Sequence, residues 1–337
     1  MIKHIGIDLG TANTLLYSRG KGIVMSAPSV VALERQTGNV IAVGEKARRM
    51  LGKTPSSILT FRPLKDGVIA DFEVTSIMLH EFFMEISAIS WLNKPNVTIS
   101  IPYGVTEVEK LAVENAVFEA GARNVSLVEE PIAAAIGSGL RVSTNRGNMI
   151  VDIGGGTTEV AVISLDGIVA SRSLRIAGDE MDNAIIQYMK AVHGMIIGEM
   201  TAEALKIKIG SAHSSTDRGS MKVYGRSAKD NANTAMEVTV HSAEIRQAIR
   251  QPLDQIVAAI KGTLEDTPPE LSADVFESGI TVTGGCALIA GIDRIINART
   301  GLRVNLSRYP LESVCRGIGR VIESDGRMEN VVRYRSR

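Results

Sequence analysis

One short pattern occurs twice in this chain of 337 residues, and it constrains the fold more than any other feature. Residues 7–18 read IDLGTANTLLYS, and residues 151–162 read VDIGGGTTEVAV. Asp8 in the first copy matches Asp152 in the second, and the glycine two residues later recurs at the same offset. Each copy predicts an apolar strand, a small polar turn and a second strand. We therefore expect two related α/β halves.

Composition and charge exclude several classes of protein. Apolar residues make up 45% of the chain and charged residues 22%, which is typical of a globular protein. The 37 basic and 37 acidic side chains balance, so there is no general electrostatic case for binding nucleic acid. The two cysteines argue against a disulfide framework and favour a reducing cytosol. We expect no secretory signal, no membrane-spanning helix and, from the scattered histidines, no histidine-based metal site.

Periodicity and turn residues predict the order of elements along the chain. In the first half we expect strands at 4–9, 14–19 and 96–102, helices at 73–92 and 105–120, and a strand leading into a helix over 126–139. In the second half we expect strands at 149–154, 158–164, 168–176 and 279–284, and helices from about 180, at 242–265 and from about 287. Residues 20–72 read as a small strand-rich insertion, and the polar residues 211–236 read as an exposed excursion.

The two repeated turns have the chemistry of a phosphate clamp. Glycines between two strands let backbone N–H groups point into a cleft, and threonine hydroxyls add further donors for an anion. Asp8 and Asp152, at the ends of the preceding strands, offer hard oxygens to Mg²⁺, directly or through water. Two such turns from two domains could hold one polyphosphate between them. The alternative is that each is a tight hairpin whose glycines serve turn geometry alone.

Longer motifs resemble a known family. The paired turns, SLVEEPIAAAIG between them and ITVTGGCALIAGI near the end resemble the actin and heat-shock-chaperone ATPase superfamily. Within it, the stretches APSVVAL, RPLKDGVIADF and RIAGDEMDNAI resemble the bacterial actin MreB family, and the likeness covers nearly the whole chain. The resemblance implies an actin-like α/β fold of two related domains with a nucleotide cleft between them. Each domain would carry a smaller inserted subdomain.

The resemblance also implies domain limits. The first domain would cover residues 1–147, with its small subdomain at about 32–74. The second would cover residues 148–337, with its small subdomain at about 181–242. The C-terminal segment is expected to pack back on the first domain.

Individual roles follow from the resemblance. Glu130 and Asp152 would be the catalytic residues, with Glu130 orienting the attacking water. Asp8 and Asp152 would hold Mg²⁺, through water. The residues implied to bind ATP or ADP are Thr11, Ala12, Asn13, Gly154, Gly155, Gly156, Thr157, Glu203, Ala204, Leu205, Lys206, Gly284, Gly285, Cys286 and Ala287.

Simpler interpretations stay open for some of these residues. Glu129 and Glu130 could both cap the alanine-rich helix that follows them, and we expect this of Glu129. Glu203 and Lys206, three residues apart on one helix face, could form a solvent-exposed ion pair. Cys286 stands where many relatives have glycine, which a nucleotide tolerates if the side chain points away from the base.

Trp91 and Leu92 are the candidate membrane contacts. MreB proteins bind membrane through an N-terminal amphipathic helix, a short apolar loop, or both. The chain begins MIKHIGIDLG, which leaves the loop to do this, and Trp91 and Leu92 lie where that loop is expected. The alternative is that Trp91 packs the preceding helix against the core.

The expected function is that of a cytoskeletal ATPase. The resemblance implies filaments of this chain at the inner face of the plasma membrane, in the cytoplasm, that set cell shape by organising cell-wall synthesis. Expected partners are further copies, the membrane, the cell-wall elongation machinery and a membrane-anchored adaptor, with no nucleic acid. The alternative is a specialised MreB paralogue or a DNA-segregating filament. A metabolite kinase or a chaperone ATPase is less expected, because the sequence shows neither an acceptor-binding base nor a substrate-binding domain after TGGCAL.

Overall fold

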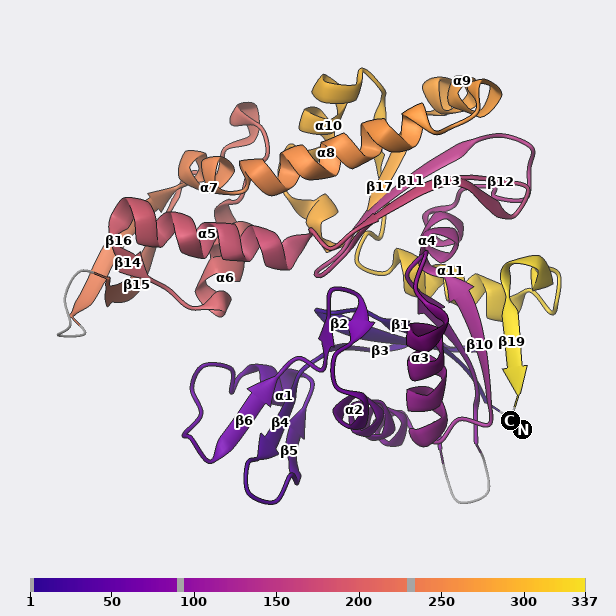
Figure 1. Ribbon diagram of the computed structural model, residues 1–337, viewed down its shortest axis with the longest axis horizontal. Coiled ribbons are helices and arrows are strands. Elements are labelled where there is room, and N and C mark those ends of the chain that lie inside the picture. Colours follow the sequence, from indigo (N-terminus) through magenta and orange to yellow (C-terminus); the bar gives the residue numbers. More distant parts are fainter. Residues whose placement is uncertain (1–2, 90–93, 229–233, 337) are drawn as a thin grey trace.

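Two β-sheets form the framework of the computed structural model, which describes residues 3–89, 94–228 and 234–336 (Figure 1). The strand order of the first sheet is β19-β10-β9-β1-β2-β3, and that of the second is β13-β12-β11-β17-β18. The first sheet consists of β1 (His4–Leu9), β2 (Asn13–Ser18), β3 (Gly22–Pro28), β9 (Asn96–Ile101), β10 (Asn124–Glu129) and β19 (Arg333–Ser336). The second consists of β11 (Asn148–Ile153), β12 (Thr158–Ser164), β13 (Gly167–Leu174), β17 (Ile280–Thr283) and β18 (Val304–Leu306).

The repeated sequence pattern produces the same strand pairing in both sheets. Strand β1 runs antiparallel to β2 and parallel to β9. Strand β11 likewise runs antiparallel to β12 and parallel to β17. The turns of the two sequence copies therefore lie at equivalent positions in the two sheets.

A smaller substructure extends from each sheet, on the same side of the molecule (Figure 1). The first contains β4 (Val31–Glu34), β5 (Val40–Val43), α1 (Glu45–Arg48) and β6 (Ile58–Phe61), followed by the hairpin of β7 (Leu64–Lys65) and β8 (Val68–Ile69). The second contains α5 (Gly178–His193), β14 (Met195–Ile196), α6 (Glu199–Ile209), a 3-10 turn (Ser214–Thr216), β15 (Ser220–Ser227), β16 (Ala235–His241) and α7 (Ser242–Ala248). The exposed excursion expected at 211–236 thus contains β15 and the start of β16, two strands of a three-stranded sheet.

The remaining helices include three that the sequence placed differently. Those outside the small substructures are α2 (Phe72–Glu85), α3 (Glu107–Glu119), α4 (Glu130–Ser138), α8 (Arg250–Glu265), α9 (Pro269–Ser278), α10 (Ile292–Thr300) and α11 (Ser313–Glu323). Helix α2 ends before residue 92 because Ser87 adopts a left-handed φ of 53° that no helix accommodates. Helix α9 begins inside TPPEL, between the helix and the strand that the sequence predicts at 242–265 and 279–284, since proline is well suited to a first helical turn. The helix expected from 287 is a 3-10 turn, Gly285–Leu288, followed by α10.

Helices α4 and α11 form a layer between the two sheets (Figure 1). Their apolar side chains join one face of β11 and β12 in a shared core that contains Ile132, Ile136, Ile150, Ala161, Ile163 and Ile318. The opposite face of β11 and β12 packs on the helices of the second half, through Val151, Ile153, Val160 and Val162. Helix α11 was not expected from the sequence, because its two glycines weaken the helical pattern.

Those glycines let α4 and α11 touch through their backbones. A methyl group added to Gly317 would overlap the carbonyl oxygen of Ala133, and one added to Gly137 would overlap the carbonyl oxygen of Ser313. Backbone atoms cannot move aside as a flexible side chain can. The layer between the sheets therefore depends on glycine at both positions.

We expect Gly317→Ala to lower the free energy of unfolding by roughly 3 kcal/mol or more, since the added carbon forces α4 and α11 apart. Thermal unfolding followed by circular dichroism measures the loss. Gly198→Ala is the matched control, because nothing lies within 4 Å of the carbon it adds. Equal melting temperatures for the two variants would contradict the contact.

Candidate functional site

The two repeated turns close in the same way. The backbone N–H of Gly10 donates to the carbonyl oxygen of Asn13 at 3.1 Å, and that of Gly154 donates to the carbonyl oxygen of Thr157 at 2.9 Å. Each hydrogen bond connects the last residues of one strand to the start of the next. The turns are therefore structural copies as well as sequence copies.

The turns lie against each other across the gap between the two halves. A carbon added to Gly155 would lie 2.8 Å from Cβ of Ala12, and one added to Gly156 would lie 2.5 Å from Oγ1 of Thr11. Neither glycine has a positive φ, and neither does Gly154. The alternative that these glycines serve turn geometry alone is wrong, because they are needed for the close approach of the two turns.

A third segment, which the sequence analysis did not single out, completes this contact. The N–H of Gly67, in the turn between β7 and β8, donates to Oγ1 of Thr11 at 3.2 Å. A carbon on Gly67 would lie 2.7 Å from Cγ2 of Thr157. The signal was the Asp-Gly pair in LKDGVIADF, which is typical of a tight hairpin. This hairpin thus touches both turns at once.

Acidic side chains gather beside the paired turns. Burial and the nearby charge of Asp152 raise the pKa of Asp8 to about 8, and burial raises the pKa of Asp152 to about 7. Burial also raises the pKa of Glu130 well above its usual value, and the charges of Asp152, Glu159 and Asp8 add to this effect. Glu130, the first residue of α4, therefore lies among the carboxyl groups of both halves. Glu159, the residue opposite Asp152 on β12, was not among the sequence candidates.

These carboxyl groups fit a magnesium ion that keeps its own water. No three His, Cys, Asp or Glu side chains in the described segments are arranged to ligate a metal directly. Mg²⁺ retains several waters and binds proteins through one or two carboxylates. Asp8 and Asp152 are buried close to each other, and their negative charges repel. A divalent cation between them would stabilise both charged carboxylates.

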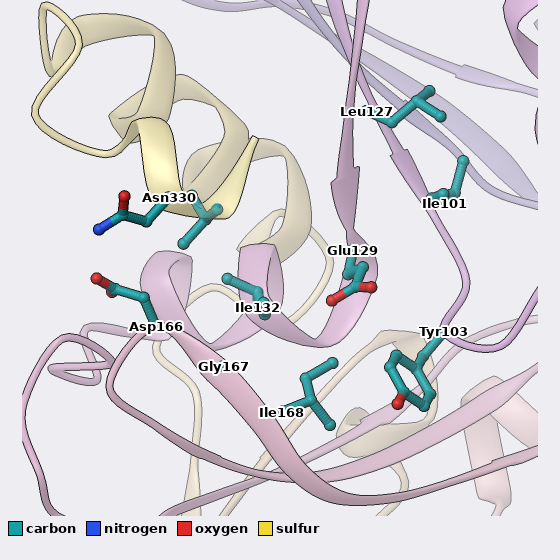
Figure 2. A pocket seen from close by; sticks show the side chains of 10 residues that line it. Ile101, Tyr103, Leu127, Glu129, Ile132, Asp166, Gly167, Ile168 and Asn330 are labelled. Atoms are coloured by element: carbon teal, nitrogen blue, oxygen red, sulfur yellow. The ribbon is translucent and has the colours of Figure 1, made fainter. Parts of the chain in front are cut away.

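Glu129 directly precedes Glu130, the first residue of α4. Glu129 occupies the N-cap position of α4, as expected, although its side chain makes no capping hydrogen bond. It instead lines a pocket of about 280 Å³, together with Tyr103 and Ile168 (Figure 2). None of the residues implied to bind nucleotide lines this pocket.

On α6, Glu203 and Lys206 each have a partner elsewhere. Nζ of Lys206 donates to Oδ2 of Asp182 at 2.7 Å and to the carbonyl oxygen of Gly178 at 2.8 Å. Glu203 pairs instead with Arg48, at 2.9 Å. The alternative of an exposed pair between Glu203 and Lys206 is therefore wrong.

The other two α6 candidates differ in exposure. The Leu205 side chain is fully buried in the core of the second half, so only its backbone is available to a ligand. Ala204 is partly exposed.

Two ion pairs connect the small substructures across the gap. Arg48, the last residue of α1, reaches Oε2 of Glu203 on α6 at 2.9 Å. Arg62, just after β6, reaches Oδ1 of Asp179 on α5 at 3.5 Å. Both pairs are partly buried, which shields them from solvent better than a surface pair. They therefore hold the two small substructures together.

The TGGCAL segment follows β17 and packs against the second turn. Gly284 has a φ of +85°, and a carbon added to it would overlap a carboxylate oxygen of Asp152. Sγ of Cys286 donates to the carbonyl oxygen of Gly154 at 3.3 Å, and burial raises the pKa of this thiol to about 11. The cysteine thus points to the second turn. Gly285 is exposed and Ala287 is buried.

The candidate membrane residues Trp91 and Leu92 lie outside the described residues. Among the helices of the described segments, none combines the length and the apolar character needed to cross a membrane.

Known proteins resemble this chain over almost its full length. A family model described as MreB/Mbl protein matches residues 2–330. The cell shape-determining protein MreB of Escherichia coli (strain K12) is 47% identical over 324 residues, which cover 95% of this chain and 93% of that protein. The cell shape-determining protein Mbl of Bacillus subtilis (strain 168) is 44% identical over 322 residues, which cover 96% of each.

Solved structures confirm the expected actin-like fold. MreB5 of Spiroplasma citri bound to AMPPNP superposes with a TM-score of 0.91 at 37% identity, covering 96% of this chain and 98% of that one. The MamK double helical filament superposes with a TM-score of 0.80 at 22% identity, covering 96% and 99%, and at that identity supports the fold alone. Matched in sequence and fold over nearly its whole length, this chain belongs to the MreB/Mbl protein family.

Proposed function

We propose that this chain binds ATP with Mg²⁺ between its two halves, hydrolyses it slowly to ADP and phosphate, and polymerises into membrane-associated filaments that help determine bacterial cell shape. The observation that carries the nucleotide site is the contact between the turns at Ala12 and Gly155, beside the carboxyl groups of Asp8 and Asp152. The S. citri relative was solved with AMPPNP and with ADP, which supports a nucleotide as the ligand.

Backbone N–H groups and hydroxyls of both turns would bind the phosphates. Thr11, Ala12 and Asn13 would do so from the first half, and residues 154–157 from the second. Asp8 and Asp152 would hold Mg²⁺ through its waters; the ion supplies charge neutralisation of the phosphates. Glu130 would orient the water that attacks the γ-phosphate.

The base and ribose would lie farther along the gap, near α6 and TGGCAL. Glu203 and Lys206 would face the ribose and base, with Ala204 and the backbone of Leu205 beside them. The base would lie against the backbone of Gly284, Gly285 and Ala287. Cys286 is compatible with this arrangement because its thiol donates a hydrogen bond to the carbonyl oxygen of Gly154.

Polymerisation and its site are proposed from the family. Cell shape-determining relatives at 44–47% identity support a cytoskeletal role, and the MamK filament shares the fold. Copies of this chain would assemble at the inner face of the plasma membrane, with Trp91 and Leu92 as membrane contacts. The cell-wall elongation machinery and a membrane-anchored adaptor would be its partners in the cytoplasm. A specialised paralogue or a DNA-segregating filament remains the alternative function, and the domain limits at residues 147 and 148 remain a prediction.

Glu130→Gln tests the hydrolytic site. We expect the rate of phosphate release to fall about a hundredfold or more, because the amide cannot orient and deprotonate water as a carboxylate does. Affinity for ATP should change by less than about threefold, since Glu130 is proposed to contact the water and not the nucleotide. Phosphate release and binding of a fluorescent ATP analogue measure the two quantities. An unchanged rate would remove Glu130 from the mechanism.

Arg48→Gln tests closure of the gap. Loss of the pair with Glu203 should speed release of bound ADP by about three- to tenfold, which corresponds to ~1 kcal/mol for a partly buried pair. Arg49→Gln is the matched control, because Arg49 pairs with Glu45 on its own helix and is exposed. Stopped-flow displacement of labelled ADP measures both variants. Equal release rates would show that the pair does not gate the site.

Electron microscopy of the purified chain on anionic liposomes tests the filament. We expect filaments on the membrane with ATP and none without nucleotide. Trp91→Ser should abolish liposome binding, because a filament binds the membrane through the sum of many weak contacts and the substitution weakens each of them. It should leave the affinity for ATP unchanged. Monomers under all conditions, with ATP still hydrolysed, would contradict the cytoskeletal role and favour a search for a small-molecule acceptor.

A further inference from the structure

Glu159 is a buried acid with an incomplete set of partners. It is 1% exposed, and Oγ of Ser173 donates to its Oε1 at 2.6 Å. Its other oxygen, Oε2, is sealed from solvent and has no hydrogen-bond partner among the described residues. An unpaired carboxylate oxygen in a protein interior destabilises the folded state, so its presence calls for a functional reason.

The fold places this oxygen on the same side of the sheet as the proposed hydrolytic residues. Glu159 lies opposite Asp152 in the β11–β12 register, and opposite residues of antiparallel strands project to the same face. That face also carries Ile150 and Ala161, which pack against α4. Helix α4 begins at Glu130. Glu159 therefore lies under the first turn of α4.

Charge coupling agrees with this placement. The charge of Glu159 raises the pKa of Glu130, and the charge of Asp152 raises that of Glu159. Burial is the main cause of the raised pKa of Glu159, about 8, while the Ser173 hydroxyl and the backbone of Tyr103 oppose the shift. Glu130 thus lies close enough to Glu159, Asp152 and Asp8 for their charges to act on it.

We propose that Glu159 is a positioning residue for hydrolysis. One proton shared between its Oε2 and the Glu130 carboxyl forms the hydrogen bond that anchors the Glu130 side chain. Ser173 fixes the Glu159 carboxyl from one side, which directs Oε2 to the base of α4. Anchored there, Glu130 presents its remaining oxygen to the attacking water. This inference rests on the proposed ATPase function. Glu159 acts through Glu130 and contacts neither nucleotide nor metal.

Two substitutions at this position separate anchoring from packing. Glu159→Met removes both oxygens at similar volume, so single-turnover hydrolysis should slow by about ten- to a hundredfold as Glu130 loses its orientation. Affinity for ATP should stay within about twofold, and the melting temperature should be equal or higher, because a buried unpaired oxygen is gone. Glu159→Gln keeps a polar side chain whose amide N–H can donate to the Glu130 carboxylate, and it should retain at least about a third of the rate.

The rates are measured per polymerised subunit, with sedimentation of the same sample as the filament assay. In the double variant Glu130→Gln/Glu159→Met, hydrolysis should be less than about twofold slower than in Glu130→Gln alone. The effects of two substitutions on residues that act as a unit are not additive. Glu114→Gln is the matched control, because Glu114 is also a buried carboxyl but lies on α3 and belongs to neither repeated turn. The Glu114→Gln variant should hydrolyse ATP at the same rate as the unmodified chain.

Three results would overturn the inference alone. They are a wild-type rate in Glu159→Met, a further large loss in the double variant, and equal losses in Glu159→Met and Glu159→Gln. Absence of hydrolysis by the unmodified chain would overturn the proposed function, and this inference with it. Slower hydrolysis in Glu159→Met with unchanged ATP affinity, restored by glutamine, would support the anchor.

Discussion

The contact between the two glycine-containing turns is the constraint on which the rest of the structure depends. Gly155 and Gly156 leave no room for a side chain of their own, so the backbone of the second turn packs directly against the Ala12 and Thr11 side chains. Everything proposed for the cleft requires this spacing, because one polyphosphate can reach both turns only if they are adjacent. Gly67 adds a third backbone to the same point.

The acid cluster beside the turns shows that the site is not optimised for stability. Buried carboxyl groups whose pKa values are raised to about 7 or 8 are disfavoured when charged in the folded state. Between the ordinary carboxyl pKa of about 4 and these values, the folded chain binds more protons than the unfolded chain, so their contribution to stability falls as pH rises. A bound cation would offset this effect. Sites that bind and react commonly carry such a cost.

The sequence predicted the parts of the molecule that repeat or that follow simple periodicity. The strand–turn–strand units and the pairing of β1, β2, β11 and β12 followed from the two copies of one pattern. Helix α11 did not, because glycine lowers helix propensity and only the tertiary contact with Ala133 explains why Gly317 is there. Local sequence also could not place Glu129, whose position at a helix start is equally compatible with capping or with a pocket.

The same distinction between local features and tertiary contacts holds for the candidate site. Residues of the turns could be named because their chemistry is local, whereas Arg48 and Arg62 reach Glu203 and Asp179 only through the folded arrangement of distant segments. Glu159 was missed for a related reason. In the sequence it is one acid in an apolar strand, and its burial and its relation to Glu130 depend on how β12 lies against α4.

The path of the chain has a consequence for how the protein is made. Strand β19, which follows the strands of the second sheet in the chain, pairs with β10 at the edge of the first sheet, and α11 covers α4 between the sheets. The first half therefore lacks an edge strand and a covering helix until α11 and β19 have been synthesised. Its exposed strand edge and the apolar face of α4 are surfaces that chaperones bind and that aggregate when unprotected. Folding of the first half is thus tied to completion of the second.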